Sequence, residues 1–182
     1  DKGKGDGVFI NTTGVGVIGH GLSIIPASIR EGDAIILSGD IGRHGVAVML
    51  AREGLSMESS VESDAAPLAD SVLELIERGI KVHCLRDLTR GGLATALVEL
   101  AQGSGSELRV SERDISVSPP VRGACEVLGL DPLYVANEGR FVCIAPASES
   151  AAVLEVLKRR PGGDNAGCIG IVARGDRPQA IL

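Results

Sequence analysis

The stretch that decides the fold is residues 34–45, AIILSGDIGRHG, in which a short apolar run breaks into a glycine-rich turn and then into a helix-like pattern. Residues 80–92, IKVHCLRDLTRGG, repeat this arrangement. The apolar runs predict strands at 34–37 and 80–85, and the patterns that follow them predict helices over about 43–53 and from 93 onward. Each stretch therefore predicts a strand that leads into a helix through glycines.

Polar residues in these two turns lie where a helix begins. The first backbone N–H groups of a helix have no partner inside it, and the helix dipole is positive at that end, so anions bind well there. Arg43, His44 and Arg90 would add charge or donors, Thr89 a hydroxyl, and Asp87 a carboxylate for a cation such as Mg²⁺. Each turn alone is more simply explained as a helix cap with glycine spacers. Two such turns in one small chain favour phosphate chemistry.

The rest of the chain alternates strands and helices without a regular βαβ series. Further helices are predicted from Pro67 to Gly79, from Ser118 or Pro119 to Gly129, and over 148–159. Further strands are predicted at 8–13, 14–18, 107–111, 115–117 and 140–144, with 168–173 and 179–182 as a closing hairpin. The polar residues 56–65 are expected to form an exposed loop. This pattern predicts an α+β fold, a mixed β-sheet covered by helices.

Composition excludes several classes of protein. The 182 residues are 44% hydrophobic, but they include only two Phe, one Tyr and no Trp, so the core must consist of Val, Ile, Leu and Ala. A net charge of −6 argues against a nucleic-acid partner, and the apolar runs are too short for a membrane helix. The four cysteines are widely spaced and form no Cys-x-x-Cys pair, and three of them lie in or beside apolar runs, which is typical of buried free thiols in a reducing compartment.

A third polar turn, Asn137-Glu138-Gly139, lies between an apolar segment and a predicted strand. A carboxylate at this position could be partly desolvated and act as a general base. The alternative is an ordinary tight turn with Glu138 in solvent. The sequence contains neither a P-loop motif nor a nucleophile elbow.

Four stretches together resemble the hydrogenase maturation protein HypE family of the PurM-like, AIR synthase-related superfamily. They are 9–14 (FINTTG), 38–45 (SGDIGRHG), 85–94 (LRDLTRGGLA) and 122–139 (RGACEVLGLDPLYVANEG). The wider superfamily shares the fold but not the GRHG and ANEG strings together. The resemblance implies a PurM-like C-terminal domain over 29–182. It also implies that 1–28 are a linker and the end of a preceding ATP-binding, AIR synthase-like domain.

The activity implied by this resemblance is that of a cytoplasmic, homodimeric enzyme that uses ATP and Mg²⁺. Enzymes of the family dehydrate a carbamoylated C-terminal cysteine to a thiocyanate, which supplies the cyanide ligands of [NiFe] hydrogenase. Phosphoryl transfer from ATP activates the amide oxygen, and a base removes the N–H protons. The partners implied are the carbamoyltransferase HypF and the HypC–HypD scaffold complex.

Site residues follow from the matching motifs. Glu138 is expected to be the catalytic base and Asp87 the metal residue. ATP and phosphate contacts are expected from Asp40, Arg43, His44, Gly45, Thr89, Arg90, Gly91, Gly92 and Asn137. The family's N-terminal domain and its terminal Pro-Arg-Ile-Cys tail are absent from this sequence, so we expect the chain alone to be inactive. The alternatives are a non-catalytic docking domain for nucleotide or maturation partners, and another PurM-like synthetase or kinase.

Overall fold

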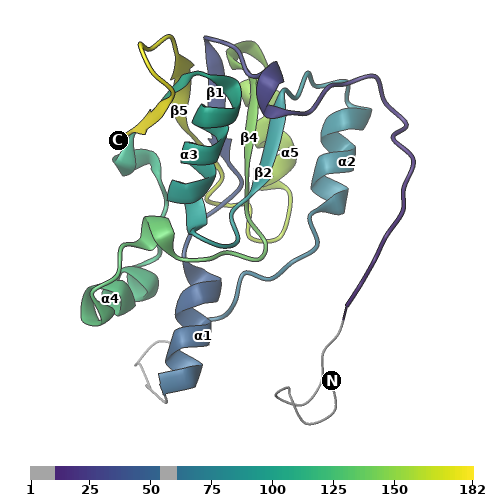
Figure 1. The fold of residues 1–182 in the computed structure, drawn as a ribbon. Coiled ribbons are helices and arrows are strands. Elements are labelled where there is room, and N and C mark those ends of the chain that lie inside the picture. Colours follow the sequence, from purple (N-terminus) through teal and green to yellow (C-terminus); the bar gives the residue numbers. More distant parts are fainter. Residues whose placement is uncertain (1–10, 54–60) are drawn as a thin grey trace.

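The structure, a computed structural model, describes residues 11–53 and 61–182 (Figure 1). The predicted strand residues 8–10, the proposed helix stop at Gly54 and the loop residues 56–60 lie outside the described residues. The predicted division of the chain at about residue 28 stays a prediction.

A six-stranded sheet in the order β2-β4-β1-β5-β3-β6 forms the centre of the molecule. All neighbouring strands are antiparallel except β3 and β6, which are parallel. The strands are β1 (Asp33–Leu37), β2 (Cys84–Asp87), β3 (Glu107–Val110), β4 (Phe141–Pro146), β5 (Gly167–Ala173) and β6 (Gln179–Ile181). The predicted α+β fold with a mixed sheet is confirmed.

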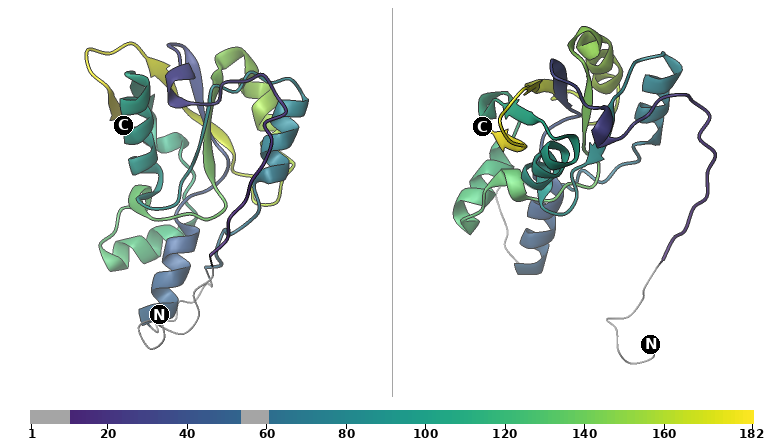
Figure 2. Two further views of the ribbon diagram at one scale, coloured as in Figure 1. Left: turned by 45° about the vertical axis from the view of Figure 1, so that its right-hand side comes forward. Right: turned by 45° about the horizontal axis from the view of Figure 1, so that its top comes forward.

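Helices cover both faces of this sheet, and two more project from one end of it (Figures 1 and 2). They are α1 (Arg43–Glu53), α2 (Ala69–Glu77), α3 (Gly92–Ser104), α4 (Pro119–Leu128) and α5 (Ser150–Lys158). Four 3₁₀ helices complete the described elements: Pro26–Ser28, Glu112–Asp114, Pro132–Tyr134 and Ala147–Glu149. Helix α3 packs on one face, α2 and α5 pack on the other, and α1 and α4 pack against each other at the end.

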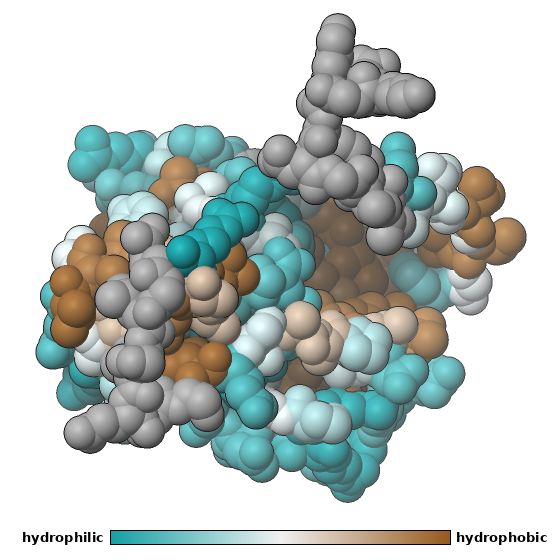
Figure 3. Space-filling model, turned by 90° about the horizontal axis from the view of Figure 1, so that it is seen from below, coloured by the Kyte–Doolittle hydropathy of each residue, from teal (hydrophilic) through white to brown (hydrophobic). Residues whose placement is uncertain are grey.

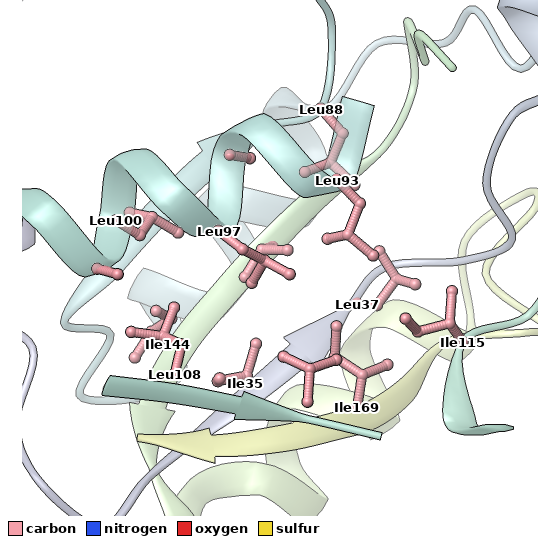
Figure 4. Close-up of a cluster of buried hydrophobic side chains, with 14 of the residues drawn as sticks. Ile35, Leu37, Leu88, Leu93, Leu97, Leu100, Leu108, Ile115, Ile144 and Ile169 are labelled. Carbon is pink, nitrogen blue, oxygen red and sulfur yellow. The ribbon is translucent and has the colours of Figure 1, made fainter. Parts of the chain in front are cut away.

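Strand β1 explains why the core has two layers. Successive side chains of a strand point to opposite faces. Ile35 and Leu37 belong to the cluster under α3 (Figure 4), and Ala34 and Ile36 belong to the cluster under α2 and α5. All five residues of β1 are buried, which is why the run is continuously apolar rather than alternating.

The second predicted strand is displaced along the chain. It was expected over 80–85, but β2 runs from Cys84 to Asp87. Ile80 and Val82 are buried in the cluster with α2 and α5, outside the sheet ladder, so their apolar character reflects packing rather than strand pairing. Asp87 is therefore the last residue of a strand rather than part of a turn.

Two other strand predictions and one pairing prediction were wrong. Residues 11–18 contain no paired strand, and Val15, Val17 and Ile18 are exposed. Residues 115–117 follow a 3₁₀ helix, and Ile115 buries its side chain from an irregular segment. The closing hairpin does not form, because β3 lies between β5 and β6. Both edges of β5 are already paired, with β1 and with β3, so β6 adds to the remaining edge of β3.

Candidate functional site

The three polar turns predicted from sequence meet at one end of the sheet, near the starts of α1 and α3. Asn137 joins them. Its backbone N–H and its Nδ2 both donate to the Leu88 carbonyl, at 3.0 and 3.1 Å, and Nδ2 also donates to the Val135 carbonyl at 3.1 Å. Its Oδ1 accepts the Gly42 N–H at 2.8 Å. The side chain is completely buried, so this amide ties the three segments together from inside.

The start of α1 already has acceptors from within the chain. The His44 N–H donates to Asp64 Oδ1 at 3.1 Å, and the Gly45 N–H donates to the Ala136 carbonyl at 3.0 Å. A Cβ on Gly45 would lie 2.6 Å from Val135 Cγ1, so only glycine lets the helix approach this closely. The N–H groups expected to hold a phosphate thus have internal partners.

Asp40 forms a buried ion pair with Arg140, and these residues are only 5% and 4% exposed. Nη2 of Arg140 lies 2.7 Å from Asp40 Oδ1, while its Nε donates to the Asp40 carbonyl at 2.9 Å and its Nη1 to the Gly139 carbonyl at 3.0 Å. A Cβ on Gly39 or Gly162 would approach the guanidinium to 2.7 or 3.0 Å. The two glycines therefore make the slot that holds the arginine.

At the start of α3, polar groups remain at the surface. Asp87 is exposed at the end of β2, pairs with Arg86, and accepts a hydrogen bond from Thr89 Oγ1 at 2.8 Å. Arg90 is exposed, and Gly91 caps the helix with φ of 78°. A Cβ on Gly92 would lie 2.5 Å from the Leu133 carbonyl oxygen, which requires glycine there.

Glu138 has an exposed side chain, and its backbone N–H donates to Asp64 Oδ1 at 3.4 Å. The described residues thus agree with the alternative of a carboxylate in solvent and not with partial desolvation. The next residue, Gly139, is buried, and a Cβ there would lie 1.9 Å from the Asp64 carbonyl oxygen. The turn is therefore fixed by its backbone while the carboxylate projects outward.

Two residues of this site, Asp64 and Arg140, were missed in the sequence. Asp64 was assigned to an exposed loop, but it is buried between α1 and the turn that carries Glu138. No local signal marks it, because its partners are distant in sequence. Arg140 could have been noticed as a charge that opens an apolar strand.

Metal and thiol chemistry have few candidates at this site. The described residues contain no group of three or more His, Cys, Asp or Glu placed to hold a metal ion. Cys84, Cys125 and Cys143 are buried free thiols, as predicted, and Cys168 is exposed. Burial, together with a smaller contribution from the nearby Cys84 thiol, raises the pKa of the Cys143 thiol to about 12. Such a thiol stays protonated and unreactive at neutral pH.

Viewed from the end that carries α1 and α4, the surface is a mosaic of polar and apolar residues (Figure 3). An apolar pocket of about 340 Å³ lies there against α1, lined by Val48, Met49, Leu130, Tyr134 and Val135. Among the described helices, none is both long and apolar enough to span a bilayer.

Comparisons with known proteins agree with this architecture. The family model for the AIR synthase related protein, C-terminal domain, matches residues 30–182. The carbamoyl dehydratase HypE of Azotobacter vinelandii is 49% identical over 172 residues, which are 94% of this chain and 50% of that protein. The chain spans about half the length of the curated relatives it matches.

Solved structures show the same likeness. A crystal structure of hydrogenase maturation protein HypE in complex with ATP superposes with a TM-score of 0.84 at 41% identity, covering 86% of this chain and 49% of that one. A crystal structure of a HypE–HypF complex superposes with a TM-score of 0.83 at 36% identity, covering 87% of this chain and 52% of the matched one.

Proposed function

The chain belongs to the family of AIR synthase related C-terminal domains, and from this premise we propose that it is half of an ATP-dependent carbamoyl dehydratase. The whole enzyme would convert a C-terminal S-carboxamide on cysteine to a thiocyanate, the source of cyanide ligands in [NiFe] hydrogenase maturation. We assign it to the cytoplasm, as a homodimer that works with HypF, since a related HypE was solved with HypF. The HypC–HypD complex would receive the product.

The strongest support for this proposal is the set of buried hydrogen bonds made by one side chain. Asn137 joins the start of α1, the turn before α3 and the Glu138 turn through buried hydrogen bonds. These lie in three of the four stretches that carry the resemblance in sequence. A carboxylate, an arginine and a hydroxyl therefore lie on turns that the fold keeps in fixed relation.

Glu138 is the proposed general base. Amide N–H protons are weak acids, so their removal at neutral pH needs a positioned base and an activated carbonyl. ATP would supply the activation, because phosphorylation turns the amide oxygen into a leaving group. The backbone of Glu138 is held by Asp64, and Gly139 allows the close packing beneath it. The backbone that carries the exposed carboxylate is thus held in a fixed position, from which the side chain would reach a substrate amide.

Phosphate contacts are assigned to the start of α3. Thr89, Arg90 and Gly91 present a hydroxyl, a charge and a helix start there. The side chains of Arg43 and His44 are partly exposed and could add contacts from α1. Asp40, Gly45 and Asn137 use their polar groups inside the protein, so they are assigned to hold the loops. The proposed roles of Gly91 and Gly92 include letting the helix start approach a ligand closely.

Mg²⁺ fits this arrangement only in part. Asp87 offers one exposed carboxylate next to the phosphate side, and protein-bound Mg²⁺ commonly takes one or two carboxylates plus phosphate and water oxygens. The ion would neutralise charge on the transferring phosphoryl group. The other protein ligands would have to come from the part of the enzyme outside this chain.

The test is Glu138→Gln in the full-length protein that carries this chain, with thiocyanate formation from a carbamoylated cysteine as the readout. We expect ATP binding to be kept and dehydration to fall by about 10²–10⁴, the usual contribution of a general base. Glu126→Gln, an exposed substitution on α4, is the matched control and should have no effect. Asp87→Asn should instead weaken ATP use that depends on Mg²⁺.

Wild-type dehydration by a folded Glu138→Gln protein would remove Glu138 from the chemistry. If no variant and no wild-type preparation dehydrates the carboxamide while ATP still binds, the docking-domain alternative would replace the enzyme proposal.

A further inference from the structure

The carboxylate of Asp64 lies at the start of α1, where the sequence predicts that an anion binds. Its Oδ1 accepts two backbone N–H groups, from His44 at 3.1 Å and from Glu138 at 3.4 Å. Asp64 is only 5% exposed, and within the described residues its Oδ2 is buried without a hydrogen-bond partner. The protein thus keeps a half-satisfied charged group at this helix start.

Such a group is costly to bury unless something compensates its charge. The negative charge of Asp64 is stabilised here as a bound anion would be, by two backbone N–H groups and by the positive end of the α1 dipole. When a helix start holds a ligand, backbone N–H groups in the position of the His44 N–H bind a phosphate oxygen. The carboxylate of Asp64 therefore occupies the position that a phosphate would take at the start of α1.

The neighbouring N–H groups of this helix start are also engaged. The Gly42 N–H donates to Asn137 Oδ1, and the Gly45 N–H donates to the Ala136 carbonyl. An external phosphate would have to displace a carboxylate that is tethered by the chain and so has a high effective concentration. It would also meet the negative charge of that carboxylate at close range.

We propose that Asp64 is a specificity residue, an internal anion that closes the start of α1 to phosphate. Phosphate groups are thereby kept out of the start of α1 and are left to the start of α3. For the phosphoryl group of the activated carboxamide this statement rests on the proposed function, in which ATP phosphorylates the amide oxygen.

The test measures binding of inorganic phosphate to this chain, by thermal unfolding and by titration calorimetry. Asp64→Ala and Asp64→Ser empty the site, and Asp64→Asn keeps it filled by an acceptor of the same size. The matched control is Asp70→Ala, which removes an exposed acid from the first turn of α2. We expect phosphate at 100 times its Kd to raise the Tm of the Ala and Ser variants by about 5–10 °C. The wild type, Asp64→Asn and Asp70→Ala should show no saturable rise.

The outcomes separate this inference from the proposed enzyme activity, because phosphate binding needs no catalysis. If Asp64→Ala and Asp64→Ser are unfolded in chloride buffer but fold when phosphate is added, the inference holds. If they stay unfolded in phosphate, it is overturned. An equal phosphate response in the wild type and the variants, or no response in a folded Asp64→Ser protein, also overturns it.

Discussion

Replacing Asn137 with alanine tests how much the buried amide contributes to the site and to the domain. The substitution removes three side-chain hydrogen bonds, two donated to carbonyls and one accepted from the Gly42 N–H. Each is worth about 1 kcal/mol net, and the buried Gly42 N–H left without an acceptor adds about 1–3 kcal/mol. We expect a loss of about 4–6 kcal/mol in the free energy of unfolding, a large part of the 5–15 kcal/mol typical of a domain.

Urea unfolding of this chain measures the change, read from the midpoint at an unchanged m-value. Asn165→Ala is the matched control, since Asn165 is exposed, and it should change stability by less than about 0.5 kcal/mol. Asn137→Asp separates the acceptor from the donor contacts, because it keeps the acceptor for the Gly42 N–H but places a carboxylate against two carbonyl oxygens. Its folded-state pKa should be raised, so its stability should be highest at acid pH and should fall as the pH rises through that pKa. A cost below about 1 kcal/mol for Asn137→Ala would refute the role of this amide.

Three further predictions concern glycines and thiols. Gly92→Ala should destabilise the chain by at least about 2 kcal/mol, because φ is +60° and the new Cβ would meet the Leu133 carbonyl. Gly123→Ala, in open space on α4, should instead stabilise by about 0.5–1 kcal/mol, and equal effects in denaturant titrations would contradict the packing argument. Under native conditions a thiol reagent should modify Cys168 alone, as mass spectrometry can check. Because the pKa of Cys143 is raised from 9.0 to about 12, its contribution to stability should decline as the pH rises from 9 toward 12.

Local patterns predicted most of the elements correctly. Helix α4 begins after Ser118 and ends at Gly129 with φ of 67°, as the proline and glycine positions predict. Strand β1 matches the apolar run 34–37, extended by Asp33. These predictions succeed because caps, turns and short apolar runs act over a few neighbouring residues.

The site could be predicted only in part, since its contacts join distant residues. Glycine turns at the starts of α1 and α3 were recognised, but nothing near Asp64 indicates that its carboxylate will fill the first of them. Asn137 was taken as a ligand residue because a polar turn gives no information on whether its side chain faces inward. The parallel pairing of β6 with β3 also escaped prediction, because it depends on which sheet edge stays free.

The position of β1 at the middle of the sheet has a consequence for synthesis of the chain. Its two neighbours are β4 and β5, so Ala34 pairs with Ala145 on one side and with Ile171 on the other. At about 5–20 residues per second, a ribosome delivers β4 roughly 5–20 s after β1. Throughout that interval β1, which is buried along its whole length in the folded domain, has no partner strand. Newly made chains therefore pass through an aggregation-prone stage, and slower translation before β4 would prolong it.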